Sequence, residues 1–332
     1  MNEIVTAADS DESDEWAAGQ EALELREVQV PQALHGQRLD KVLAELVPEF
    51  SRSYLQQLLA QGAVRVAGCV ATKASAKVRW GDGLVVEMRP TAQSQSFKHE
   101  AMALDIVFED AHLLVVNKPA GLVVHPAPGN WSGTLLNGLL AHHAGAAQVP
   151  RAGIVHRLDK DTSGLMVMAK TRSVMDALVA MIAQREVSRQ YVALGHGAWA
   201  GEMRTVRHAI GRDPRNRLRM AVVDLSQHAG KPAQTDITPI DSMKEACLVH
   251  CKLYTGWTHQ IRVHMASLLH PLLADALYGG VAKAGITRQA LHAYRLGFDH
   301  PITGEALLLR ADPPADFMGA VDFLGLRYNP PA

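Results

Sequence analysis

Apolar residues recur along this chain in two different periods, and the change between them separates two regions. Residues 37–90 contain two short stretches with helical spacing, the first made of Leu39, Val42, Leu43 and Leu46. Ser51 can cap the second helix and Gly62 can end it. Short apolar strands are expected at Val64–Val66 and Leu84–Met88. The pattern predicts a small α+β module.

The second region, residues 101–330, mixes many short apolar runs with few helices. Helical spacing is clearest in Leu135–His142, Ser173–Arg185 and His259–Leu269. Five apolar runs are expected to be strands: Leu113–Val116, Leu122–Val124, Gly164–Ala169, Ser188–Gly195 and Leu248–Leu253. Strands and helices do not alternate regularly, so a mixed, mostly antiparallel sheet is predicted and not a doubly wound fold. The polar segment Pro90–Glu100 is the expected linker.

The segment Ile154–Met168 holds the most informative polar residues of the chain. A polar loop, His156–Gly164, separates two apolar runs, and this order predicts strand, turn and strand. Asp159 lies in the turn between Arg157 and Lys160, and these cations favour its charged form. Such a carboxylate can act as a nucleophile or base without a metal ion. In an arbitrary loop, capping of the turn would be the simpler interpretation.

Charge is distributed unevenly along the chain. Residues 1–27 carry nine acidic residues and one basic residue, a charge of −8, so the remainder carries +7 because the whole chain carries −1. The composition predicts that residues 1–30 form an acidic, disordered tail. The basic remainder permits RNA binding without demonstrating it.

An arginine-rich stretch lies between Met203 and Lys231. It shows little apolar periodicity, and seven arginine and histidine residues lie between positions 204 and 219: Arg204, Arg207, His208, Arg212, Arg215, Arg217 and Arg219. A solvated loop and a basic finger that grips RNA phosphates are both compatible with this composition.

Cysteine usage and hydropathy bear on the compartment. The three cysteines, Cys69, Cys247 and Cys251, offer neither a disulfide framework nor a C-x-x-C motif. No apolar run approaches the length of a membrane span, and the acidic N-terminal residues lack the basic and apolar parts of a signal peptide. A cytoplasmic protein without a membrane partner is expected.

Several motifs of the second region together resemble one family of RNA-modifying enzymes. In order they read VNKPAGLVVHP, VPRAGIVHRLDKDTSGLMV, HQIRVHMA and HPLLADALYGG. They are similar to the RluA-type pseudouridine synthases, the family that includes the ribosomal large-subunit enzymes. The resemblance implies isomerisation of uridines in 23S rRNA or in a precursor of the large ribosomal subunit, with tRNA as the alternative substrate. It also implies a monomer. No cofactor is expected, because the reaction oxidises nothing and loses no group.

The resemblance assigns roles to four residues. Asp159 matches the catalytic aspartate, and the sequence leaves open whether it attacks C1′, adds to the base or takes a ribose proton. Tyr191 matches the tyrosine that stacks on the target uracil and can remove the C5 proton, although an ordinary strand tyrosine would explain it equally by itself. Arg262 matches the basic partner of the aspartate. Arg157 resembles the arginine that fills the RNA helix after the target base is flipped out.

The first region resembles the alpha-L RNA-binding domain, a module first known from a small-subunit ribosomal protein. The motifs that carry this similarity are Arg38-Leu39-Asp40, Ser51-Arg52-Ser53, Gly62 and Gly81-Asp82. It implies that Arg38, Ser51 and Arg52 bind RNA.

Two positions depart from the family pattern. Trp257 replaces an arginine in the usual T-G-R-T-H-Q, and we expect its ring to offer RNA a stacking surface. Asp275 lies between two alanines where the pattern has G-D-P, a change expected to adjust only a loop. His259 and His264 lie five residues apart and would point to different faces of a helix, so capping or packing is expected of them and not metal binding.

Two other functions are compatible with parts of the sequence. The D-x-D spacing of Asp159 and Asp161 also occurs in aspartyl phosphatases, but His156 and Arg157 interrupt the strand that should precede it, and a further acidic pair for magnesium is hard to find. A non-catalytic RNA-binding protein is favoured only by Trp257. Neither alternative accounts for Asp159, Tyr191 and Arg262 together.

Overall fold

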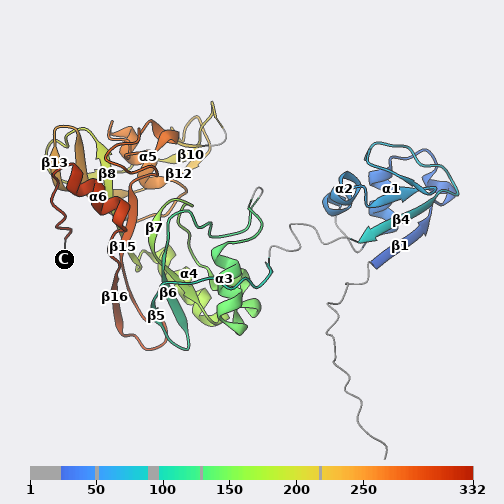
Figure 1. Cartoon of the computed structure of the whole chain (residues 1–332), viewed down its shortest axis with the longest axis horizontal. Coiled ribbons are helices and arrows are strands. Elements are labelled where there is room, and N and C mark those ends of the chain that lie inside the picture. The colour runs from blue at the N-terminus through green and yellow to red at the C-terminus, as the bar shows by residue number, and fades with distance from the viewer. Residues whose placement is uncertain (1–23, 49–51, 89–96, 128–129, 217–218, 332) are drawn as a thin grey trace, which may run out of the picture. The chain divides into compact units, whose positions relative to one another are not determined.

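The computed structural model describes residues 24–48, 52–88, 97–127, 130–216 and 219–331. The chain divides into two compact units, residues 1–94 and 95–332. Figure 1 shows the elements of both, and each unit is described by itself.

Unit 1 is a four-stranded antiparallel sheet packed against two helices. The strands lie in the order β1-β4-β2-β3. Leu39, Leu43, Leu55 and Leu58 of the helices are fully buried against Leu84 and Val86 of β4. The elements are β1 (Glu24–Gln29), the 3-10 helix η1 (Gln32–Leu34), α1 (Leu39–Leu46), α2 (Arg52–Ala60), β2 (Val64–Val66), β3 (Cys69–Val70) and β4 (Gly83–Met88).

Strand β1 corrects the expected extent of the acidic tail. The sequence assigned residues 1–30 to that tail, but residues 24–29 pair with all six residues of β4. β1 is an edge strand, which is hydrogen-bonded to a neighbour on one side only. Charged side chains such as those of Arg26 and Glu27 are common on edge strands. The other residues of the predicted tail, 1–23, lie outside the described part of the chain.

Unit 2 is built on a nine-stranded sheet with the order β5-β6-β7-β15-β8-β14-β13-β9, in which β16 pairs with β15. Only the pair β7–β15 is parallel, which confirms the expected mixed, mostly antiparallel sheet. The strands are β5 (Ile106–Glu109), β6 (Leu113–Lys118), β7 (Ser163–Ala169), β8 (Ser188–His196), β9 (Arg204–Val206), β13 (Thr235–Met243), β14 (Ala246–Leu253), β15 (Leu291–Asp299) and β16 (Ala306–Arg310).

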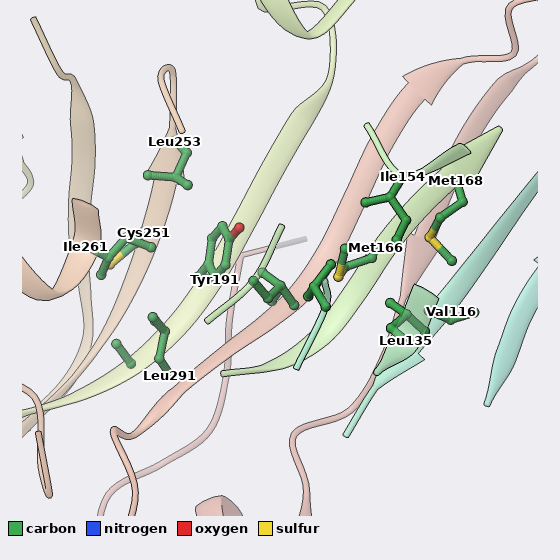
Figure 2. Packing of buried hydrophobic residues seen from close by; sticks show 14 of the residues in the cluster. Val116, Leu135, Ile154, Met166, Met168, Tyr191, Cys251, Leu253, Ile261 and Leu291 are labelled. Atoms are coloured by element: carbon green, nitrogen blue, oxygen red, sulfur yellow. The ribbon is translucent and has the colours of Figure 1, made fainter. Parts of the chain in front are cut away.

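Helices cover both faces of this sheet. One face packs against α3 (Leu135–His142) and α5 (Gln260–Ser267), whereas the opposite face packs against α4 (Arg172–Gln184) and α6 (Ala315–Phe323). Figure 2 shows part of the first face, where Tyr191 of β8 lies between apolar side chains of neighbouring strands. The 3-10 helices η3 (Ala144–Gln148), η4 (Pro150–Gly153) and η5 (Ala276–Tyr278) complete the unit.

Three expected elements differ from the structure. Ile154 makes a single bridge to Met168 and does not begin a strand, because η4 ends immediately before it. Residues 122–124 form no strand. The stretch from Met203 to Lys231 contains β9 and a small sheet of β10 (Ile210–Arg212), β11 (Met220–Val222) and β12 (Gly230–Lys231), with residues 217–218 outside the described chain.

Within the described chain, no helix is both long enough and apolar enough to cross a membrane.

Candidate active site

A cavity of about 400 Å³ opens on the face of the sheet that carries α5. It is lined by the loop that precedes β7, the first residues of β8, the end of α4 and the segment from Leu253 to Arg262. Asp159, Tyr191, Arg262, Arg157 and Trp257 all line it. The fold therefore brings together five residues that are up to 105 positions apart in the sequence, as Arg157 and Arg262 show.

The loop that carries Asp159 is fixed from beneath by a buried lysine. The ammonium of Lys118 is fully buried and donates to three backbone carbonyls, among them that of Lys160 at 3.0 Å. The same carbonyl accepts from the backbone N–H of Gly121 at 2.9 Å. Burial lowers the pKa of Lys118 to about 7, while the nearby carboxylates of Asp161 and Asp159 oppose the shift. The NKPAG motif thus positions the loop that carries Asp159.

Gly164, at the end of this loop, must be a glycine. Its φ of +117° is unfavourable for other residues, and a Cβ there would lie 2.3 Å from the carbonyl oxygen of Ala293. The close approach allows β7 to pair with β15 directly after the loop. The backbone that follows Asp159 is therefore held against the centre of the sheet.

Arg262 of α5 joins two carboxylates. Its Nη1 donates to Oδ2 of Asp159 at 2.9 Å, and its Nε and Nη2 donate to the two carboxylate oxygens of Asp275 at 2.7 and 2.8 Å. Burial opposes the charge of Arg262, but the hydrogen bonds and negative charges of Asp275 and Asp159 together outweigh it and raise the pKa of the guanidinium. The bidentate contact fixes the plane of the guanidinium, so one N–H is aimed at Asp159.

Asp159 keeps one carboxylate oxygen for a ligand. Among the described residues, the side-chain hydrogen bond it accepts goes to Oδ2, and its side chain is 17% exposed. Asp159 lines the cavity, and its Oδ1 has no hydrogen-bond donor among the described residues. A carboxylate anchored at one oxygen and free at the other can serve as a nucleophile or a base.

Tyr191 forms part of the apolar floor. It lies on β8 opposite Cys251 of β14, is 6% exposed, and packs with Leu253, Leu291 and Ile261 (Figure 2). Burial raises the pKa of its phenol to about 12, although the charge of Arg189 acts in the opposite direction. The phenol consequently holds its proton at neutral pH, and its ring offers a flat surface for a base.

His259 was expected to be a capping or packing residue, and it occupies the N-cap position of α5, although its side chain makes no cap hydrogen bond. It also lines the cavity beside Asp159. Its Nε2 lies 3.8 Å from Oδ2 of Asp159, and its Nδ1 lies 2.8 Å from the hydroxyl of Tyr278. That hydroxyl accepts from the N–H of Met220 and so can donate to Nδ1, which leaves the proton of the neutral ring on Nε2. Burial lowers the pKa of His259 against the attraction of Asp159. His264, by contrast, is fully buried, as expected for packing.

Arg157 and Trp257 lie where the cavity meets solvent. Arg157 is exposed, and Trp257 is 36% exposed. The indole N–H donates to the carbonyl of Pro232 at 2.8 Å, and the ammonium of Lys231 lies 4.6 Å from the ring centroid. Lys231 thus supplies a cation beside the position where the family pattern has an arginine.

In unit 1, the two arginines expected to bind RNA meet at one buried carboxylate. Asp40 is fully buried and accepts from Arg38 at 3.0 Å, from Arg52 at 2.5 Å and from Gln56 at 3.1 Å. The hydrogen bonds from Arg38 and Arg52 hold the pKa of Asp40 far below its usual range. Both arginine side chains remain about half exposed, at 50% and 49%. Ser51, the third expected contact, lies outside the described residues.

Sequence patterns missed three residues of the site. The alanines that flank Asp275 were expected to adjust only a loop and Asp275 itself was assigned no role, yet it is 2% exposed and holds Arg262. His259 and Arg189 also line the cavity. A signal existed for Asp275, since a carboxylate inside the apolar run PLLADALY needs a buried partner.

Comparison with known families agrees with this geometry. Residues 112–267 match the family model of RNA pseudouridylate synthase, and residues 37–84 match that of the S4 domain. The S4 match covers the module whose resemblance to a ribosomal-protein domain was noted from the sequence. The expected fold of both regions is confirmed.

Relatives match over nearly the whole length. Ribosomal large subunit pseudouridine synthase D of Neisseria meningitidis serogroup B is 47% identical over 96% of this chain and 86% of its own. The protein of the same name from Nitrosomonas europaea is 45% identical over 95% of this chain and 94% of its own.

Solved structures share the fold of unit 2. Human RNA pseudouridylate synthase domain containing 1 aligns with a TM-score of 0.52 at 27% identity, over 68% of this chain and 87% of its own. The identity over nearly the full length, together with the cavity that joins Asp159, Tyr191 and Arg262, establishes that this chain belongs to the RNA pseudouridylate synthase family.

Proposed function

We propose that this protein converts specific uridines of large-subunit ribosomal RNA to pseudouridine. The observation that carries the proposal is the cavity in which Arg262 holds Asp159 beside the ring of Tyr191. The relatives named as ribosomal large subunit pseudouridine synthase D support 23S rRNA or its precursor particle as the substrate. Such a substrate would place the protein in the cytoplasm, where we expect it to act as a monomer.

The charge of the cavity suits a polyanion. Four arginines line it, namely Arg157, Arg185, Arg189 and Arg262, and Asp159 is the one acidic residue among the described lining residues. A concave surface with an excess of one charge concentrates ligands of the opposite charge. A uridine that is flipped out of an RNA helix brings its flanking phosphates to such a surface.

Each of these residues would have a different role in the isomerisation. The ring of Tyr191 would stack on the uracil, and the apolar floor of Leu253 and Leu291 would exclude water from the freed base. Asp159, with Oδ1 unoccupied, would act on the ribose or the base. Arg157, exposed at the mouth, would fill the gap that the flipped base leaves in the RNA helix. Metal ions enter none of these steps.

The substrate can be identified by mapping pseudouridines in rRNA and tRNA from a strain that lacks the gene and from its parent. We expect one or a few positions in 23S rRNA to lose the modification and to regain it when the wild-type gene is restored. Loss confined to tRNA would assign the tRNA substrate instead. An unchanged map in both RNAs would favour the non-catalytic alternative.

A further inference from the structure

Arg189 is a buried cation for which the described residues provide no partner. Its side chain is 7% exposed, and its Nε is buried without a hydrogen-bond acceptor. No ion pair or side-chain hydrogen bond joins its guanidinium to another described residue. A buried charge without acceptors is costly, so its retention calls for a reason.

The guanidinium of Arg189 lies at the cavity wall. Arg189 precedes Tyr191 by two residues on β8, so both side chains leave the same face of the strand. Gly256 leaves room for the guanidinium in this position, because a Cβ there would lie 2.4 Å from Nη1 and the end of the arginine side chain would have to move. The strand therefore places Arg189 on the face that lines the cavity together with Tyr191.

The other arginines of the cavity have different tasks. Arg262 uses three of its N–H groups on Asp275 and Asp159. Arg157 and Arg185 are exposed. Of these four arginines, Arg189 alone combines depth with side-chain donors that no described residue accepts, so it is the cation best placed to meet a group delivered to the floor.

The depth of Arg189 selects the part of the substrate that it meets. Tyr191, its neighbour on the same face, is as deeply buried and would stack on the uracil. A donor at that depth reaches the base, whereas the phosphates of the RNA backbone remain nearer the mouth with Arg157. The acceptors that uracil offers there are its two carbonyl oxygens.

The chemistry requires a donor at these oxygens. When the N1–C1′ bond breaks, its electron pair leaves with the base, and the negative charge is shared by N1 and the carbonyl oxygens of uracil. The pair is used again when C5 bonds to C1′, after which C5 loses one proton and N1 gains one. Nothing is oxidised or reduced, so the barrier depends on how well the charge of the departing uracil is stabilised.

We propose that Arg189 is a catalytic residue that donates hydrogen bonds to a carbonyl oxygen of the target uracil and stabilises the base as it leaves. The inference rests on the proposed function, and it adds an anion-stabilising donor that the sequence motifs did not indicate.

The first test compares substitutions of Arg189 under single-turnover conditions, on an RNA hairpin that carries the uridine mapped as described above. Arg189→Met should lower the rate at saturating enzyme by about 10²- to 10³-fold and change the Kd for the hairpin by less than about threefold. Arg189→Lys, which keeps the charge but not the planar fork, should recover part of the rate. Arg295→Met is the matched control, because Arg295 is half-buried on the neighbouring strand β15 and does not line the cavity.

The second test separates contact with the base from a structural role or a contact with phosphate. Hairpins with 2-thiouridine or 4-thiouridine at the target have a weaker acceptor at one carbonyl. One of them should slow the wild-type protein about tenfold or more, yet add little to the defect of Arg189→Met. Pseudouridine is measured among the nucleosides after digestion of the RNA. A hairpin with a methylphosphonate beside the target uridine tests contact with the phosphate in the same way.

Three outcomes would overturn the inference. The first is full activity of Arg189→Met. The second is that the effect of each thio-substitution on the rate adds fully to that of Arg189→Met. The third is that the effect of Arg189→Met depends on the methylphosphonate and on neither thio-substitution. If wild-type protein forms no pseudouridine, the proposed function fails as well, whereas an active wild type with an indifferent Arg189 removes this inference only. Misfolding of Arg189→Met would be visible in its melting curve. In that case the thio-substituted hairpins would be tested with Arg189→Lys, and the same dependence of their effects on the substitution would be measured.

Discussion

At the scale of single residues, the site depends on how each carboxylate is held. Asp159 has one oxygen bonded to Arg262 and one without a donor among the described residues, whereas both oxygens of Asp275 are bonded to Arg262. We therefore expect Asp159 to react and Asp275 to hold the arginine in place. Exchanging either carboxylate for an amide should separate the two roles.

Asp159→Asn should abolish pseudouridine formation and leave RNA affinity nearly unchanged. The amide keeps the shape of the side chain and can still accept from Arg262, but it loses the charge and the nucleophilicity. Release of tritium from C5-labelled uridine in RNA measures the turnover, and a filter-binding titration measures the affinity. Appreciable turnover by the purified variant would rule out Asp159 as the catalytic carboxylate.

Asp275→Asn should destabilise unit 2 and also slow the reaction. Removing one partner of a buried ion pair costs about 3–5 kcal/mol, and we expect the lower end because Asp159 still bonds Arg262. Urea unfolding measures the stability. Asp176→Asn is the control, because its pair with Arg172 is exposed and should contribute little. Equal effects of the two substitutions would contradict a structural role for Asp275.

Trp257→Arg should change the affinity for RNA and not the rate of the chemical step. Arg262 already bonds Asp159, and Lys231 lies over the indole, so the active carboxylate does not depend on a cation at position 257. The added charge should improve affinity and steepen its salt dependence, with nearly the same single-turnover rate at saturating enzyme. Wild-type protein that is inactive until Trp257→Arg restores it would instead show that the arginine belongs to the catalytic machinery.

The sequence indicated those residues whose chemistry is carried by a short motif. Asp159, Tyr191 and Arg262 each lie in a recognisable motif, and the structure brings all three to one cavity. Asp275 and Arg189 matter because of what lies beside them in space. The apolar run around Asp275 indicated that its carboxylate needs a buried partner, but neither that partner nor the place of Arg189 beside Gly256 could be predicted, since these contacts form only in the folded chain.

At the scale of elements, α5 is connected to β13 by a chain of polar side chains beneath the site. Gln260 donates to Oγ1 of Thr235 at 2.9 Å, and that hydroxyl lies 2.9 Å from Nδ1 of His264. Nε2 of His264 lies 3.0 Å from the carbonyl of His208. The chain is satisfied when His264 is neutral with its proton on Nε2. Protonation would remove the acceptor that Thr235 requires.

This arrangement predicts a stability loss in acid that His264 carries in part. Burial lowers the pKa of His264 to about 4 from its ordinary value of 6.5. Between those values the unfolded chain binds a proton that the native chain does not, so stability falls as the pH falls. His264→Gln should be less stable at pH 7, but it should lose less than the wild type on going to pH 5, by up to about 2 kcal/mol.

Unfolding of the two proteins in urea at pH 7 and pH 5 measures that difference. His228→Gln provides the comparison, because His228 is exposed and should leave the pH dependence as it is. Parallel curves for wild type and His264→Gln would show that His264 is not the titrating group.

Elements were predictable where periodicity was strong. The expected helix Leu135–His142 agrees with the structure, as does the helix that became α4 to within a residue at each end. β10 and β11 were missed because they lie in an arginine-rich stretch with little apolar periodicity, and their small apolar cluster includes Val263 from α5. β1 was missed because its charges resemble those of the acidic segment before it.

At the scale of the whole molecule, the distribution of charge separates the two units' tasks. The chain is nearly neutral overall, but residues 28–332 carry a charge of +7. Arg38 and Arg52 in unit 1 share one buried carboxylate and expose half of their side chains, which suits contact with phosphates. Unit 2 places four arginines at the cavity beside a single acidic residue among the described lining residues. We infer that unit 1 supplies affinity and that unit 2 supplies the chemistry.

Removal of residues 1–94 tests this division. The cut follows the boundary between the units, and it keeps Lys98, whose carbonyl accepts from the side chain of Asn137 in α3 at 2.9 Å. Unit 2 has its own core on both faces of the sheet, so its melting transition should persist in the truncated protein. Affinity for rRNA fragments should fall, and its dependence on salt should become shallower because fewer phosphates are contacted.

The full chain with Arg38→Gln and Arg52→Gln is the matched comparison. It keeps unit 1 in place and removes only the two charges that flank Asp40, so it should reproduce part of the loss in affinity and in salt slope. Unfolding of unit 1 in this variant would be visible as a lost transition and would be distinguished from a lost contact. Truncated protein that binds rRNA fragments as tightly as the full chain, with the same salt slope, would show that unit 1 does not bind RNA and that the arginines of the cavity carry the affinity themselves.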